Sequence, residues 1–132
     1  MTTTQQHAHD AIGALARERT VLLTTFRRDG TPVATPVHIA PGPSVAYART
    51  FDPSGKVKRL RRSPEALAAP CTFRGRVTGP TTNVVVRELQ GDDAERAAAA
   101  LAAKYPFLHG RLIPWLHRVK GVRTVHLELC EP

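Results

Sequence analysis

Cysteine and long apolar runs are both scarce in these 132 residues, and each scarcity excludes a class of protein. Cys71 and Cys130 lie far apart and form no CxxC pair, so neither a disulfide framework nor a zinc knuckle is indicated. We interpret both as buried apolar residues and expect a reducing, cytoplasmic location. The stretch 1–11 is polar and holds no apolar run long enough for a signal peptide or membrane span, so we expect no membrane partner.

Side-chain constellations for hydrolytic or metal chemistry are also missing. No serine stands in a GxSxG elbow, and no carboxylate pair suggests hydrolysis. Apart from His38, the histidines show no metal-ligand spacing with carboxylates. We therefore expect no metal site and no catalytic residue that reacts by itself.

The charge is strongly one-sided. A formal net charge of +8 predicts an anionic partner, and both nucleic acid and a phosphorylated coenzyme qualify. One dense cluster without an intervening acid carries much of it, made of Lys56, Lys58, Arg59, Arg61 and Arg62. The chain has only one Trp, two Tyr and four Phe, and near the cluster only Tyr47 and Phe51 lie on a predicted strand. This is thin support for a base-stacking surface.

Hydrophobic periodicity predicts about six strands with helices between them. We predict helices over His9–Arg19, Ser54–Arg62, from Asp92 to Lys104 and over Leu108–Val119, the last interrupted by Pro114. We predict strands over Thr20–Phe26, Pro32–Ala40, Val45–Phe51, Leu67–Phe73, Asn83–Leu89 and Arg123–Leu129. Turns are expected at Asp29-Gly30, at Pro41-Gly42-Pro43 and at Arg74-Gly75-Arg76.

Two local features sharpen this pattern. Pro36 cannot donate a ladder hydrogen bond. At that point its strand must therefore be an edge of the sheet, form a bulge, or face something other than another strand. Asp92-x-x-Glu95 resembles a capping box at a helix start. The meander of hairpins predicts an α+β fold, a six-stranded antiparallel split β-barrel with peripheral helices. We expect one domain over 1–132, with residues 1–8 flexible.

The stretch Ser54-Gly55-Lys56-Val57-Lys58-Arg59-Leu60 combines several phosphate-binding devices. Gly55 permits close backbone approach, the first helical N–H groups favour an anion, and the lysines add full charge. It is not a Walker loop, because Val57 stands where Ser or Thr would hold magnesium. A solvated basic helix face is the alternative, and the position after the third strand favours the phosphate site.

Two blocks of sequence resemble the flavin/deazaflavin oxidoreductase superfamily, whose best-known branch is pyridoxamine 5′-phosphate oxidase. Arg28–Val33 with Thr35-Pro36-Val37 is similar to the opening hairpin of that family. Ser54–Arg62, Ala69-Pro70-Cys71 and Arg74-Gly75-Arg76 resemble its central block. The resemblance is greatest to the actinobacterial F420-dependent branch.

The resemblance implies a homodimeric split barrel that binds coenzyme F420 at the subunit interface and transfers hydride to or from a conjugated small molecule. Lys56 and Lys58 would hold the phosphate, and Thr50 would lie near the linker to the tail. Arg61 and Arg62 are weaker candidates for the oligoglutamate tail. The other implied coenzyme-binding residues are Ser54, Gly55, Val57 and Arg59 at the phosphate and Thr35, Pro36 and Val37 along the ring.

His38 departs from the aromatic residue that many members of the family carry at this position. It alters the substrate pocket, donates a proton, or merely fills the strand's smaller face. The apolar set around Trp115 is a packed helix face, a dimer contact or a lid. Four alternatives stay open for function: FMN in place of F420, a non-catalytic F420 carrier, a basic nucleic-acid-binding barrel, and an interaction module with a degenerate site.

Overall fold

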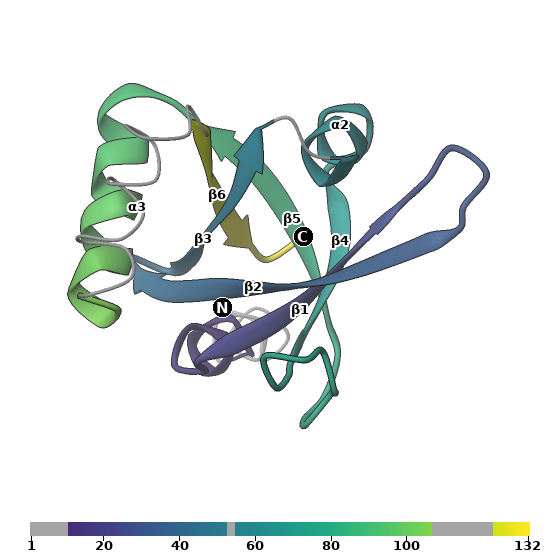
Figure 1. Cartoon of the computed structure of the whole chain (residues 1–132), viewed down its shortest axis with the longest axis horizontal. Helices are drawn as coiled ribbons and strands as arrows, with labels where there is room; N and C mark the ends of the chain where they lie inside the picture. The colour runs from purple at the N-terminus through teal and green to yellow at the C-terminus, as the bar shows by residue number, and fades with distance from the viewer. Residues whose placement is uncertain (1–10, 53–54, 107–122) are drawn as a thin grey trace, which may run out of the picture.

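The computed structural model describes residues 11–52, 55–106 and 123–132, and Figure 1 shows their arrangement. The strands are β1 (Thr20–Phe26), β2 (Pro32–Gly42), β3 (Val45–Asp52), β4 (Glu65–Pro70), β5 (Thr82–Leu89) and β6 (Arg123–Cys130). The helices are α2 (Gly55–Arg62), α3 (Gly91–Lys104) and an N-terminal segment over residues 11–16. The expected flexibility of 1–8, the predicted helix start at Ser54 and the predicted helix Leu108–Val119 with Trp115 lie outside the described residues.

The six strands close into one antiparallel barrel in the order β1-β2-β3-β6-β5-β4. This confirms the predicted six-stranded antiparallel barrel of the α+β class. The β1–β2 hairpin turns at Gly30, whose φ of 88° lies in the left-handed region that favours glycine, as the Asp29-Gly30 signal predicts. None of the helices in the described ranges is long and apolar enough to cross a membrane.

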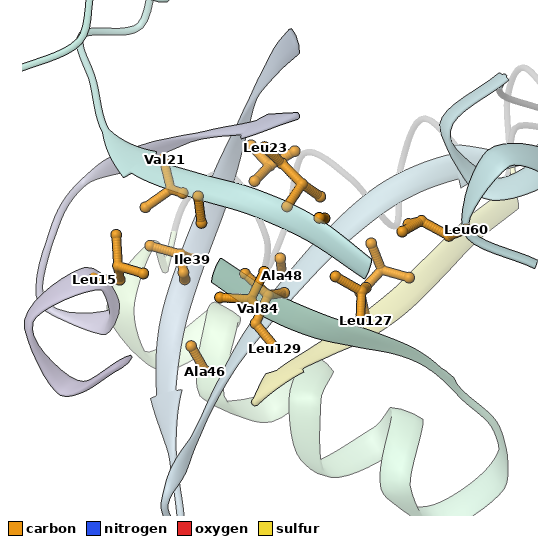
Figure 2. Close-up of a cluster of buried hydrophobic side chains, with 14 of the residues drawn as sticks. Leu15, Val21, Leu23, Ile39, Ala46, Ala48, Leu60, Val84, Leu127 and Leu129 are labelled. Carbon is orange, nitrogen blue, oxygen red and sulfur yellow. The ribbon is translucent and has the colours of Figure 1, made fainter. Parts of the chain in front are cut away.

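Alternate residues of the strands point inward and fill the barrel, as Figure 2 shows for the labelled side chains. Val125, Leu127 and Leu129 of β6 are buried, as their alternation predicts. Val57 and Leu60 of α2 add to the same cluster, so this helix is held by its apolar face. The basic residues of α2 are thereby fixed in place relative to the barrel.

The register of β2 creates an opening in the barrel. β2 pairs with β1 from Thr20↔His38 to Phe26↔Pro32, but it pairs with β3 only from Ile39↔Ala48 to Gly42↔Val45. Beyond Ile39↔Ala48 the two strands part, and in Figure 1 β3 runs toward α2 while β2 continues into the arm that it shares with β1. We call this place the β2–β3 fork, with its base at Ile39 and Ala48. Pro36 is paired with Leu22 of β1 but lies in the stretch of β2 that does not pair with β3, so the strand is an edge there, as one of the sequence-based alternatives predicts.

Helix α3 packs on β2, β3 and β6, at the paired end of the fork. Ala97 and Leu101 are fully buried and belong to the face of the helix that packs on the barrel. The capping-box prediction is wrong: α3 begins at Gly91, its N-cap is Gln90, and no side chain caps it. Gly91 has a φ of 54°, so the chain turns one residue earlier than the Asp92 signal suggests, and Asp92 lies inside the first turn.

Three other elements differ from the sequence predictions by two residues or more at one or both ends. β4 spans Glu65–Pro70 instead of Leu67–Phe73, because it pairs with β5 from Glu65↔Val85 and then turns. The β2–β3 turn lies at residues 43 and 44, since β2 extends through Gly42. The N-terminal helix ends at residue 16 and not at Arg19.

Candidate functional site

A cavity of about 360 Å³ lies at the β2–β3 fork, within the range of small-molecule sites. Its lining draws on β1, β2, β3, α2 and the β4–β5 connection. The lining residues are Thr20, Thr35, Pro36, Val37, His38, Arg49, Thr50, Lys56 and Phe73. No carboxylate occurs among these described residues, so the electrostatic character of the cavity is positive.

Lys56 is a buried lysine in the wall of this cavity. It stands in the first turn of α2 with a relative exposure of 6%. Burial, and secondarily the charge of Arg59, lowers the pKa of its ammonium. Among the residues whose side chains the structure describes, none accepts a hydrogen bond from this ammonium or pairs with it.

Lys104 shows how the same fold treats a lysine with a structural role. Its ammonium donates to the carbonyl oxygens of Ala16 and Ile39, both at 2.7 Å, and also to that of Glu18. Three acceptors compensate its desolvation, which follows the general rule for buried charges. Lys56 shows no such acceptor among the side chains that the structure describes, and it lines the cavity.

The remaining residues of the basic cluster point to other partners or to solvent. Arg59 donates through Nε to Thr25 Oγ1 at 2.6 Å. Arg61 forms a two-point ion pair with Glu88, at 3.0 and 2.8 Å, and Arg62 donates to the Phe26 carbonyl at 2.7 Å. Lys58 is exposed and does not line the cavity.

Six of the sequence-predicted residues meet at the cavity: Thr35, Pro36, Val37, His38, Thr50 and Lys56. Val57 lies in the hydrophobic core, and Gly55 begins α2. Ser54 lies outside the described residues. The structure thus brings the predicted ring-side residues of β2 and one predicted phosphate-side residue of α2 to one place.

Three lining residues were not among the sequence candidates. Arg49 follows Tyr47 on the outward face of β3, and the local sequence predicts an ordinary exposed strand residue at this position. Thr20 begins β1, and Phe73 lies at the turn after β4, where it is 77% exposed. Only the fork brings them together, so no local pattern could have selected them.

The prediction that both cysteines are buried is confirmed for Cys71 and wrong for Cys130, which is half-buried. Both are free, Cys71 is buried, and burial raises the pKa of each thiol. The Cys130 thiol donates to the Val85 carbonyl at 3.5 Å. A raised thiol pKa disfavours the thiolate, so neither residue has the character of a nucleophile. Among the residues that the structure covers, no group of three or more His, Cys, Asp or Glu could hold a metal ion.

Comparison with known proteins finds relatives by structure only. No family model matches the chain, and no curated protein matches its sequence. HutZ, the heme storage protein from Vibrio cholerae, matches with a TM-score of 0.67 and 13% identity over 95% of this chain and 90% of that one. A candidate pyridoxamine 5′-phosphate oxidase from Listeria innocua matches with a TM-score of 0.60 and 14% identity over 92% and 90%.

A third solved structure, a candidate 5-nitroimidazole antibiotic resistance protein from Bacteroides thetaiotaomicron, matches with a TM-score of 0.56 and 10% identity over 97% of this chain and 86% of that one. At these identities the matches establish the fold, and a fold hosts many functions. The chain therefore has the fold of the pyridoxamine 5′-phosphate oxidase-like split barrels.

Proposed function

We propose that this protein binds coenzyme F420 in the cavity at the β2–β3 fork and transfers a hydride between the reduced coenzyme and a conjugated small molecule. One observation carries the anionic part of this proposal: the Lys56 ammonium is buried at a cavity wall without an acceptor among the side chains that the structure describes. Leaving a buried cation without compensation costs several kcal/mol, on the order of 3–5 kcal/mol where a partner is removed. A phosphate oxygen supplies that compensation when the coenzyme binds.

The residues around Lys56 fit a phosphorylated, ring-bearing coenzyme. Pro36 and Val37 give apolar wall for a flat ring, and Thr35 and Thr50 offer hydroxyl groups. The N-terminal end of α2, where Gly55 and Lys56 stand, favours a negative charge. Lys56 would hold the phosphate, with Gly55, Arg59 and Ser54 beside it, while Lys58 would meet the outer anionic part.

The chemistry of hydride transfer belongs to the coenzyme when it is bound, and the protein binds, orients and excludes water. Thr35, Pro36 and Val37 would fix one ring face, so that the other face stays open to substrate. Val57 would act indirectly, because its burial in the core fixes α2 and with it Lys56. We assign no catalytic side chain to the transfer itself.

Two observations bear on the choice of coenzyme. The net charge of +8 and the exposed Lys58 favour a coenzyme with further negative charge beyond the phosphate, as F420 has and FMN lacks. Arg61 supports this less, since Glu88 already compensates its charge. FMN binding, and F420 storage without turnover, remain the alternatives within this proposal.

Haem binding is a second candidate, suggested by the HutZ match together with one feature of the cavity. His38 lines the cavity, and burial, with Arg49, Arg19 and Lys104, lowers the pKa of its imidazole. A neutral imidazole is the form that ligates iron. Nucleic-acid binding has less support, because the Tyr47 ring is buried against Leu89 and Ala97 and is not presented to bases.

We extend the proposal to a cytoplasmic homodimer. Both cysteines are unpaired, which suits a reducing compartment. Phe73 and Val77 on the β4–β5 connection are exposed apolar residues, and such residues are available for a subunit contact. Equilibrium sedimentation tests the dimer, with one species at monomer mass as the contrary result.

Parallel calorimetric titrations of the purified protein with F420, FMN, hemin and a single-stranded oligonucleotide test the coenzyme assignment. Tight F420 binding with weak FMN binding supports the proposal, and subsequent loss of F420H2 absorbance on addition of conjugated acceptors tests turnover. Binding of hemin alone favours the second candidate. Salt-sensitive binding of the oligonucleotide alone overturns both.

A further inference from the structure

One aromatic side chain lies in the wall of the cavity and is open to solvent at the same time. Phe73 lines the cavity at the β2–β3 fork, yet its relative exposure is 77%. Single exposed apolar residues are common on protein surfaces and carry no meaning alone. Phe73 differs because its side chain borders a volume of ligand size. A flat molecule in the cavity can therefore cover apolar surface that the fold itself leaves in water.

A tight loop holds Phe73 in this position. The backbone N–H of Gly75 donates to the carbonyl of Thr72 at 2.9 Å, and the N–H of Thr72 donates to the carbonyl of Arg76 at 2.9 Å. The N–H of Arg76 also donates to the Thr72 hydroxyl at 3.1 Å. Gly75 has a φ of 90°, the left-handed conformation that closes a hairpin loop of this kind. Phe73 and Arg74 therefore form the tip of an ordered turn.

The same loop packs against the wall of the cavity. A Cβ atom at Gly75 would lie 3.6 Å from Pro36 Cγ and 3.6 Å from Leu22 Cδ1, so the loop backbone lies directly on β1 and β2. Pro36 is itself a lining residue. The Arg74 guanidinium lies 5.5 Å from the centroid of the Phe73 ring, a cation–π contact that helps to orient the ring. A ligand that meets Phe73 thus finds a preorganised surface, which lowers the entropy cost of binding.

Phe73 and Lys56 reach the cavity from different parts of the fold. In Figure 1 the β4–β5 connection and α2 lie on opposite sides of the paired strands β1 and β2. The proposed function places the coenzyme phosphate beside Lys56, in the first turn of α2. A substrate must exchange with solvent at each turnover, and a lining residue that is itself exposed meets that requirement. The position of Phe73 therefore suits the substrate.

We propose that Phe73 stacks on the conjugated ring of the hydride-exchanging substrate and so selects flat aromatic molecules over saturated ones. This inference rests on the proposed function, because it takes the cavity to hold coenzyme and substrate together. Aromatic pairs are stabilised by offset-stacked or edge-to-face contacts, which a puckered saturated ring cannot make. The ring of the coenzyme is the competing source of the same contact, and the experiment separates the two.

The test uses 2-naphthol and trans-decahydro-2-naphthol, two probes that share a bicyclic skeleton and a hydroxyl group but differ in flatness. Calorimetry gives the affinity of each for the full chain, and the affinity for F420 is measured beside them. Phe73→Leu keeps an apolar side chain without a ring, and Phe73→Tyr keeps the ring. Val77→Ala is the matched control, because it truncates an exposed apolar residue of the same connection that does not line the cavity.

We expect the wild type, Val77→Ala and Phe73→Tyr to bind naphthol about 3–10-fold more tightly than its saturated counterpart. Phe73→Leu should lose this preference and keep the F420 affinity of the wild type. Equal affinity of the wild type for both probes overturns the inference, whether or not the variants fold. A preference that Phe73→Leu retains also overturns it. A fall in F420 affinity in Phe73→Leu overturns the assignment to the substrate, since the ring would then serve the coenzyme.

The two proposals fail separately. If the wild type prefers naphthol and Phe73→Leu loses that preference while F420 does not bind at all, the aromatic site stands and the coenzyme assignment falls. If F420 binds and the probes are not distinguished, the coenzyme assignment stands and the aromatic site falls. Sedimentation of the same variants covers the subunit contact: a lower mass of Phe73→Leu with the probe preference intact would show that the ring serves the dimer, and would overturn the inference.

Discussion

The rings of His38 and Tyr105 stack with their centroids 4.8 Å apart and their planes inclined by 27°. The Tyr105 hydroxyl donates to the Arg19 carbonyl at 2.6 Å, lies 2.9 Å from the Ile39 carbonyl and accepts from the Ile39 N–H at 3.5 Å. The residue that ends α3 therefore holds both β2 and the start of β1. Thr20 and His38, which line the cavity, are the immediate neighbours of the two residues held in this way.

Tyr105→Phe keeps the ring on His38 but removes the hydroxyl. Because buried backbone groups then lose their partner, we expect the free energy of unfolding in urea to fall by about 1–3 kcal/mol. Tyr47→Phe is the matched control, since Tyr47 is also buried and the described residues give its hydroxyl no hydrogen-bond partner. Equal effects of the two substitutions would show that the Tyr105 hydroxyl does not hold the fork.

The imidazole of His38 makes stability depend on pH. Its folded pKa lies below the unfolded value of 6.5, mainly through burial and then through Arg49, Arg19 and Lys104. The unfolded chain therefore binds more protons between these two pKa values, and stability falls as the pH drops below about 6.5. His38→Gln should flatten this part of the profile. Parallel wild-type and variant curves from urea unfolding at pH 7.5 and about 5.5 would contradict it.

Lys58 and Arg61 test whether α2 recognises the tail of F420. Lys58 is exposed, so Lys58→Gln should weaken F420 binding by up to about 1 kcal/mol and leave FMN binding unchanged. The loss of F420 affinity should be larger at low salt, where surface charges are screened less. Arg61→Gln should change F420 affinity less, because Glu88 compensates that arginine. Equal losses for F420 and FMN in Lys58→Gln would show that this lysine contacts the shared phosphate and not the tail.

The sequence could predict the strands because each carries its own alternation. Thr20–Phe26 is predicted with both ends correct, and β5 and β6 differ from prediction by one residue at one end. The end of β4 could not be predicted, because the apolar Phe73 suggests a continuing strand although it stands exposed in a turn. The start of α3 is set by the left-handed backbone of Gly91, which competes with the Asp92 capping signal.

The candidate site could be predicted only where the chain itself is distinctive. Pro36 and the basic run around Lys56 are visible in the sequence, and both reach the cavity. Arg49 is a single charged residue in an alternating strand, and its burial follows from where β2 leaves β3. The β2–β3 register is a non-local property, so the place of Arg49 at the cavity appears only in the folded chain.

The most direct test of the central claim compares Lys56→Met with Lys104→Met. Each variant is measured without ligand by thermal unfolding and then by calorimetric titration with F420. Lys104→Met should lower Tm, because it removes the ammonium that donates to the carbonyls of Ala16, Glu18 and Ile39.

Lys56→Met should do the opposite. Removing this buried cation should stabilise the ligand-free protein by about 1 kcal/mol and so raise its Tm by a few degrees. The same substitution should weaken the binding of F420 by about 1.5–3 kcal/mol. In this account Lys56 lowers the stability of the ligand-free fold and stabilises the protein only when an anion is bound beside it. A lower Tm in Lys56→Met, as in Lys104→Met, with unchanged F420 affinity would show that Lys56 is structural and would contradict the account.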